Sequence, residues 1–225
     1  MKTFSTLLPL LLLFSDSQPR EIKIFNYCDF PTWAAIQGPG NPGNGSFKLE
    51  SMQTKSIFVD DDWTGGKIWP MTGCNKTMEC ATGNLNGTTP QPPYTLAEIT
   101  LGGDNALDFY SVTLANGYNV PVLIDAYQGA GSCGRAGGCV EDPNKECSQR
   151  GKVIRGILHL SHLRRLYHSG GWTVGCKSDC QGRPVSKCRD SRMFKEYCPE
   201  SYANEFDDKS LTKTCFDATY VVQFC

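Results

Sequence analysis

The sequence has almost no net charge. Its 22 lysines and arginines nearly balance its 23 aspartates and glutamates, which gives a formal charge of −1 and a pI near 6.3. Nucleic acids and anionic membranes attract strongly basic surfaces. Neither is therefore expected as the main partner of this chain.

Long hydrophobic runs are also scarce. The one clear run covers residues 7–14, whereas a membrane-spanning helix needs about 20 apolar residues. We expect no transmembrane segment and a soluble mature protein. Because the run follows Met1-Lys2 and precedes Ser15-Asp16-Ser17, residues 1–17 are predicted to be a cleaved secretory signal peptide. A buried strand or a membrane anchor is the alternative.

Patterns of metal ligands are sparse as well. Cys176 and Cys180 come nearest to a zinc-ligand pair, but no second pair follows them. His159 and His162 could share a helix face, yet spacing places no third ligand beside them. We expect no metal and no cofactor. Residues 151–169, which also hold His168, are instead predicted to form an amphipathic surface helix with basic residues outward; a metal-binding or membrane-active insertion is the alternative.

Cysteine, by contrast, is abundant. Twelve cysteines all lie beyond the predicted signal peptide. An even number in a secreted chain indicates disulfide pairing in an oxidising compartment, although cysteine order alone fixes no connectivity. Three Asn-x-Ser/Thr sequons in turn-like segments predict glycosylation at Asn44, Asn75 and Asn86.

Short strands dominate the rest of the chain. Segments with apolar/polar alternation or β-branched residues are separated by turns rich in Gly, Pro and Asn, which predicts a β-sandwich or barrel. One helix is expected between a cap at Asp190 or Ser191 and Pro199, with Met193, Phe194 and Tyr197 on its apolar face. The last strand is expected to return to the first sheet. The predicted strands are residues 21–26, 32–36, 47–49, 56–59, 67–69, 95–101, 107–114, 119–124 and 219–224.

A set of short motifs runs from one end of the chain to the other. They are Asn26-x-Cys28, Trp33-Ala34-Ala35, Gly65-Gly66-Lys67-Ile68-Trp69, Thr72-Gly73-Cys74, Cys80-Ala81-Thr82-Gly83, Pro92-Pro93-Tyr94-Thr95-Leu96-Ala97-Glu98, Asp108-Phe109-Tyr110, Gly117-Tyr118-Asn119-Val120-Pro121, Cys176-x-x-x-Cys180, Phe194-Lys195-x-x-Cys198-Pro199-x-x-Tyr202 and Phe224-Cys225. With these motifs the chain resembles the thaumatin-like proteins, or pathogenesis-related family 5, a secreted family with antifungal members.

The resemblance implies a mainly β fold. A flattened antiparallel β-sandwich is expected at residues 18–128 plus 205–225, and a small disulfide loop at 72–93. A disulfide-rich domain of loops and short helices is expected at 129–204, with an atypical insertion near 150–170. Some of the family's cysteines are absent in whole pairs, so the chain resembles a divergent member. The remaining pairs implied by the resemblance are Cys28–Cys225, Cys74–Cys80, Cys133–Cys215, Cys139–Cys198, Cys147–Cys176 and Cys180–Cys188.

The resemblance also implies a cleft between the sandwich and the disulfide-rich domain. Many family members line it with one basic and four acidic residues. Ser111 and Asn116 occupy two of the acidic positions and do not ionise. The positions that match are Lys67 for the basic residue and, for the acidic ones, Glu98, Ser111, Asn116 and Asp207 or its neighbour Asp208, with Asp108 expected beside them.

A pair of carboxylates in such a cleft could cleave a β-1,3-glucan, and Glu98 with Asp207 are the catalytic candidates. However, fewer like charges remain here to raise a carboxyl pKa. An ion pair between Glu98 and Lys67 is therefore the favoured interpretation of Glu98. The aromatic side chains of Trp69, Phe109, Tyr110 and Tyr118 could stack on sugar rings, although core packing is their commoner use.

The function favoured by the sequence is that of a secreted, monomeric, glycosylated defence protein with an antifungal or stress-response role. It is expected to bind β-1,3-glucan or a related cell-wall polysaccharide through the cleft without cleaving it. If the source is a plant, it is expected in the apoplast or vacuole. The alternatives are a weak endo-β-1,3-glucanase and a protein inhibitor of a hydrolase, whose partner would be another protein.

Overall fold

The computed structural model of the protein describes residues 18–148, 150–155, 172–178, 180 and 182–225. The predicted signal peptide and the three histidines lie outside these residues, so both predictions remain untested. The start of the predicted 151–169 helix is described, and it is wrong there. The strand β12 (Lys152–Arg155) pairs antiparallel with β13 (Trp172–Cys176), next to the Cys147–Cys176 disulfide.

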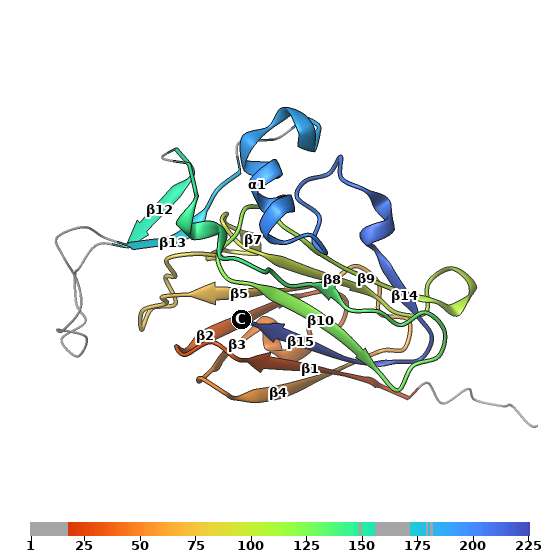
Figure 1. Cartoon of the computed structure of the whole chain (residues 1–225). Coiled ribbons are helices and arrows are strands. Elements are labelled where there is room, and N and C mark those ends of the chain that lie inside the picture. Colours follow the sequence, from red (N-terminus) through yellow and green to blue (C-terminus); the bar gives the residue numbers. More distant parts are fainter. Residues whose placement is uncertain (1–17, 149, 156–171, 179, 181) are drawn as a thin grey trace, which may run out of the picture.

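Two stacked sheets form the body of the molecule and confirm the predicted sandwich (Figure 1). One has the strand order β11-β10-β15-β1-β4, with β11 (Ala136–Gly137), β10 (Val122–Tyr127), β15 (Thr219–Phe224), β1 (Arg20–Asn26) and β4 (Thr54–Val59). The other has the order β14-β9-β8-β5-β2-β3, with β14 (Lys213–Cys215), β9 (Asp108–Thr113), β8 (Leu96–Thr100), β5 (Gly66–Thr72), β2 (Thr32–Gln37) and β3 (Ser46–Leu49).

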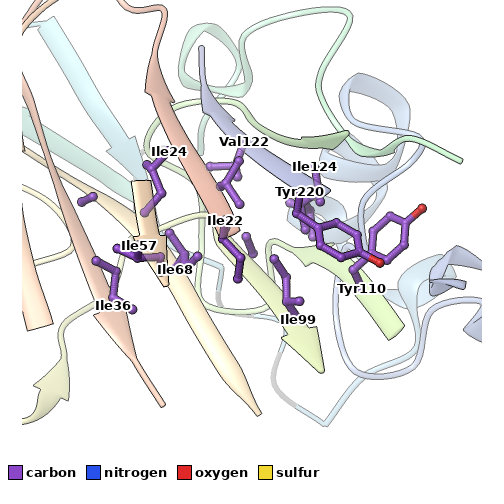
Figure 2. Close-up of a cluster of buried hydrophobic side chains, with 14 of the residues drawn as sticks. Ile22, Ile24, Ile36, Ile57, Ile68, Ile99, Tyr110, Val122, Ile124 and Tyr220 are labelled. Carbon is purple, nitrogen blue, oxygen red and sulfur yellow. The ribbon is translucent and has the colours of Figure 1, made fainter. Parts of the chain in front are cut away.

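The main core lies between the two sheets. Strands such as β1 alternate buried and partly exposed residues, because successive side chains point to opposite faces of a sheet. Figure 2 shows Ile22, Ile24, Val122 and Ile124 of the five-stranded sheet packed near Ile68 and Ile99 of the other. The rings of Tyr110 and Tyr220 meet edge to face, with 5.1 Å between their centroids.

The last strand returns to the first sheet, as the sequence predicts. It inserts between β1, to which it runs parallel, and β10, to which it runs antiparallel. The Cys28–Cys225 disulfide closes the ends of β1 and β15 over a sequence separation of 197 residues. All twelve cysteines are paired, and the six pairs are those implied by the resemblance.

Smaller elements lie on the face of the six-stranded sheet that points away from the main core (Figure 1). The helix α1 (Arg189–Tyr197) closely matches the predicted one, and its Phe194 is fully buried near Tyr118 and Leu114. A two-stranded hairpin is formed by β6 (Leu85–Asn86) and β7 (Thr89–Pro90). Short 3-10 helices lie in the connecting loops: η1 (Pro42–Gly45), η2 (Asp104–Ala106), η3 (Pro143–Lys145), η4 (Val185–Lys187) and η5 (Lys209–Leu211).

The predicted domain boundaries remain predictions. Within the described residues, no helix is long and apolar enough to cross a membrane. The same part of the chain contains no group of three His, Cys, Asp or Glu side chains that could hold a metal ion.

Candidate functional site

A row of polar side chains crosses the outer face of the six-stranded sheet. Cross-strand pairing places Gln37 opposite Lys67, Lys67 opposite Glu98, and Glu98 opposite Ser111. Residues paired directly across neighbouring strands lie on the same face of a sheet. Four strands therefore present an amide, an ammonium group, a carboxylate and a hydroxyl side by side.

A mostly apolar row, which ends in the polar Thr113, lies next to the polar one. Trp69, Leu96 and Thr113 are each two positions along the strand from Lys67, Glu98 and Ser111, so they project from the same face. Trp69 is fully buried and its indole Nε1 donates to the Gly83 carbonyl oxygen at 2.9 Å. Its ring lies 5.6 Å from that of Tyr94, which is also buried.

These two rows form the floor of an open cleft of about 550 Å³. Three segments build its walls. They are the β6–β7 hairpin, the turn at residues 115–116, and the segment 202–212, which begins at Tyr202, where an isolated β-bridge joins it to Thr113. The residues that line the cleft are Gln37, Lys67, Trp69, Pro90, Tyr94, Leu96, Glu98, Ser111, Thr113, Ala115, Asn116, Tyr202, Asn204, Glu205, Lys209 and Thr212.

The charged groups of this cleft balance one another. Lys67 and Lys209 are its cations, and Glu98 and Glu205 are its anions. The ion pair predicted between Glu98 and Lys67 is not formed, because no N···O contact within 4.0 Å joins them even though their residues are paired across the strands. In the described part of the chain, the side chains of Lys67, Glu98, Ser111 and Asn116 make no protein hydrogen bond, which leaves them free for a ligand.

Two ionisable groups of the cleft have shifted pKa values. Burial raises the pKa of the Tyr94 phenol, and the negative charge of Glu98 raises it further. Tyr94 therefore remains a neutral group beside Glu98 at neutral pH. A hydrogen bond from the Gly182 backbone N–H to Glu205 Oε1, 2.9 Å long, holds the pKa of the Glu205 carboxyl below its usual value. Glu205 is thus a persistent anion and a poor proton donor.

The placement of Asp108 in the cleft is wrong. Asp108 is fully buried between the two sheets, where its carboxylate accepts hydrogen bonds from Arg20, Tyr220 and the backbone N–H of Gly102. Strand parity explains the error, because Asp108 and Ser111 are three residues apart on β9 and must point to opposite faces of the sheet.

Asp207 and Asp208 are not among the residues that line the cleft either. The Asp207 carboxylate accepts from the backbone N–H of Ala203 at 2.9 Å and of Asp208 at 2.8 Å, and it lies 3.3 Å from Lys195 Nζ. Asp208 caps η5 by accepting from Ser210 N–H at 2.9 Å. Both side chains shape the loop, and the structure does not bring Asp207 together with Glu98. Glu205, two residues earlier, lines the cleft instead.

Sequence reasoning missed several lining residues. Leu96 and Thr113 follow from parity once Glu98 and Ser111 are placed, so their signal was present in the sequence. Glu205 lies in an irregular loop, and Lys209 begins the three-residue 3-10 helix η5 that follows it, so neither belongs to a repeating pattern from which to predict the direction of its side chain. Of the aromatic candidates, Tyr110 and Tyr118 are buried in other clusters: Tyr110 in the main core and Tyr118 near α1.

Comparisons with known proteins agree with the resemblance. A family model described as the thaumatin family matches residues 26–225. A thaumatin-like protein of Arabidopsis thaliana is 34% identical over 96% of this chain and 93% of its own. Pathogenesis-related protein 5 of the same plant is 33% identical over the full length of both chains. Among solved structures, a thaumatin-like xylanase inhibitor is similar at 18% identity and a TM-score of 0.48, over 91% of this chain and 98% of its own.

Proposed function

The chain belongs to the thaumatin family, and we propose that it is a secreted defence protein whose cleft binds β-1,3-glucan or a related cell-wall polysaccharide without cleaving it. The observation that supports this most is the pairing of a polar row with an apolar row on one sheet face. Sugars present hydroxyl groups at their edges and C–H groups on their faces. A floor with both kinds of surface can bind both.

The hydrogen-bonding capacity of the floor supports the same proposal. Lys67 can donate, Glu98 can accept, and Ser111 and Asn116 can do both. None of these side chains is engaged with another described part of the protein, so binding a hydroxyl group would not require breaking an existing bond. The formal charges of the cleft sum to zero, which favours a neutral polysaccharide over an acidic one.

Binding is favoured over hydrolysis because of the state of the carboxylates. A glycoside hydrolase of the common type needs two carboxyl groups across the scissile bond, one of which has a raised pKa and donates a proton. The two acids that line the cleft are Glu98 and Glu205, and the pKa of Glu205 is lowered. Asp207, the predicted partner of Glu98, does not line the cleft and is engaged with the backbone of its own loop. Weak hydrolysis through Glu98 is the second candidate.

The test combines binding and hydrolysis in one sample. The protein is incubated with insoluble β-1,3-glucan, chitin and xylan, and both the bound fraction and the released reducing sugar are measured. We expect retention on glucan with no release above a no-protein blank. Substituting Glu98→Gln or Lys67→Ala should weaken retention about tenfold, because each removes a charged hydrogen-bonding group.

Two matched variants control for surface charge. Glu196→Gln lies on the exposed side of α1, and Lys23→Ala lies on β1 in the other sheet; both should retain glucan normally. Sugar release that disappears in Glu98→Gln would overturn binding without cleavage and support the hydrolase. Absence of retention together with inhibition of an added hydrolase would favour the protein-inhibitor alternative.

A further inference from the structure

The floor of the cleft is longer across the strands than along them. Each of β5, β8 and β9 contributes only two lining residues, one from each row, and these lie about 7 Å apart along the strand. Across the strands, the polar row runs from Gln37 on β2 to Ser111 on β9. Thr212, which also lines the cleft, continues the row, because the next residue, Lys213, pairs with Tyr110 of β9.

The length of this extended polar row matches about four sugar units. Its positions on successive strands are about 4.8 Å apart, so the four spacings between Gln37 and Thr212 give roughly 19 Å. A sugar unit in an extended chain advances by roughly the same distance as one strand spacing. Successive units can therefore lie over successive strands. A chain along a strand would meet only two positions of the floor.

The two long sides of the floor differ, and neither favours a chain that runs along the strands. Next to the mostly apolar row, Tyr94 and the turn at residues 115–116 form a wall, in which the Tyr94 N–H donates to the Asn116 carbonyl oxygen at 3.3 Å. On the other side, Thr100 is the next residue after Glu98 on the same face of β8, and it does not line the cleft. A chain that followed β8 would therefore meet the Tyr94 wall at one end and leave the cleft at the other.

The side chains at the two ends of the extended polar row are held in place by the walls. Gln37 Nε2 donates to the carbonyl oxygen of Thr88, in the turn of the β6–β7 hairpin, and its Oε1 accepts no hydrogen bond from any described residue. Thr212 Oγ1 lies 2.9 Å from the Tyr202 hydroxyl, and a hydroxyl group can make more than one hydrogen bond. Because both side chains are already ordered, binding a ligand to them loses little conformational freedom.

We propose that an extended polysaccharide chain lies across the strands, with one sugar unit over each, and that Gln37 and Thr212 bind its end units. Lys67 and Glu98 bind the central units. This orientation rests on the proposed function, because it takes the ligand to be a polysaccharide. It makes Gln37 and Thr212 ligand-binding residues, and it limits the length of chain that the cleft recognises to about four units.

The first test measures how affinity depends on chain length. The dissociation constants of soluble β-1,3-linked glucose oligomers, from the disaccharide to the heptasaccharide, are measured by calorimetry. We expect the affinity to rise with each added unit up to about the tetrasaccharide and to change less than about twofold beyond it, because further units lie outside the floor. A plateau already at the disaccharide, or an affinity that still rises between the hexasaccharide and the heptasaccharide, would overturn the proposal.

The second test determines the direction of the chain with matched threonine variants. Thr212→Val removes a hydroxyl at the end of the extended polar row, and Thr100→Val removes one on β8 beside Glu98 but outside the cleft. We expect Thr212→Val and Gln37→Leu each to weaken tetrasaccharide binding about fivefold, the effect of one lost hydrogen bond. Disaccharide binding, which needs only the central positions, should be unchanged in both. Thr100→Val should bind both ligands like the wild type.

Two results of the second test would contradict the proposal. Weaker tetrasaccharide binding in Thr100→Val, with normal binding in Thr212→Val, would show that the chain runs along β8. An equal loss of disaccharide and tetrasaccharide binding in Thr212→Val and Gln37→Leu would show that these residues shape the cleft and do not bind the end units.

Retention on insoluble β-1,3-glucan separates this proposal from the proposed function. If the protein is retained and binds the oligomers with an affinity that does not depend on their length, the orientation is wrong and the proposed function stands. If the protein neither is retained nor binds any oligomer, both are wrong.

Discussion

Substitution of Asp108 tests most directly whether this residue stabilises the fold or belongs to the cleft. Its two carboxylate oxygens accept hydrogen bonds from Arg20 Nη1 at 3.2 Å and Nη2 at 2.7 Å, from the Tyr220 hydroxyl at 2.8 Å, and from the Gly102 backbone N–H at 3.0 Å. The Asp108 side chain is fully buried and that of Arg20 is 14% exposed. The substitution Asp108→Asn turns one acceptor oxygen into a donor and removes the buried counter-charge of Arg20, which leaves only the exposed Asp217 carboxylate, 3.8 Å from Arg20 Nε.

The cost of this substitution follows from the burial of the pair. Removing one partner of a buried ion pair costs about 3–5 kcal/mol, because the other charge is left uncompensated. Arg20 keeps a hydrogen bond to the Ala218 carbonyl at 2.7 Å and some contact with solvent, so we expect the lower end of that range. For a chain of this size, a loss of about 3 kcal/mol lowers the melting temperature by roughly 10 °C.

The assay is denaturant and thermal unfolding with the disulfides intact, together with glucan retention well below the transition. Tyr220→Phe serves as a graded control: it removes one hydrogen bond to the same carboxylate and should cost about 1–2 kcal/mol. Retention should be unchanged in both variants. An Asp108→Asn protein with wild-type stability and lost retention would refute the structural role and return Asp108 to the cleft.

The remaining predictions concern stability. Above the unfolded tyrosine pKa of about 10, stability should fall by about 1.4 kcal/mol per pH unit for each buried tyrosine that keeps its proton only in the folded state. Burial raises the pKa of Tyr94, Tyr110, Tyr118 and Tyr220. The absorbance at 295 nm, which reports tyrosine ionisation, should therefore change at the same pH as the protein unfolds. Replacing Cys28 and Cys225 together by serine should lower the free energy of unfolding by on the order of 5 kcal/mol on the chain-entropy account, since the bridge spans 197 residues; a denaturant midpoint equal to the wild type would contradict this. Gly66→Ala should cost about 1–3 kcal/mol by overpacking, because its Cβ would lie 1.8 Å from a ring carbon of the buried Trp63. Gly134→Ala, whose Cβ would meet nothing closer than 3.7 Å, is the matched control, and equal melting temperatures would disprove the packing argument.

Local sequence patterns were enough for the helix and for most of the long strands of the sandwich, but they did not predict the short strands β6, β7, β11, β12, β13 and β14. Alternation in residues 21–26 predicted β1, and the apolar residues before Pro199 predicted α1, because these signals depend only on chain geometry and hydrophobic burial. The predicted strand at 119–124 is displaced in the structure to Val122–Tyr127. Asn119, inside the predicted strand, is buried and hydrogen-bonds to the Pro70 carbonyl and to Thr82 instead of joining a ladder.

The cleft was only partly predictable. Predictions for residues on regular strands were right, and those for residues in a loop were wrong. Lys67, Glu98 and Ser111 lie on regular strands, so their shared face follows from pairing and parity. The predicted acids at 207 and 208 lie in a loop, where no repeating geometry relates one side chain to the next. There, hydrogen bonds to Ala203 and Ser210 direct those carboxylates into the loop and leave Glu205 to line the cleft.

The sequence by itself determined the β-sandwich, the family and the positions of the cleft's strand residues, because alternation and motif order are properties of the chain. Only the tertiary structure decided that Asp108 is a buried ion-pair partner of Arg20 and that the β6–β7 hairpin forms a cleft wall. It also decided that Glu98 and Lys67, although opposite each other on neighbouring strands, form no ion pair. Each of these depends on which sheet face or loop meets a segment distant in sequence, such as Arg20 and Asp108 at a separation of 88 residues. Such contacts form only when the sheets stack and the loops pack against them, so a local sequence pattern cannot predict them.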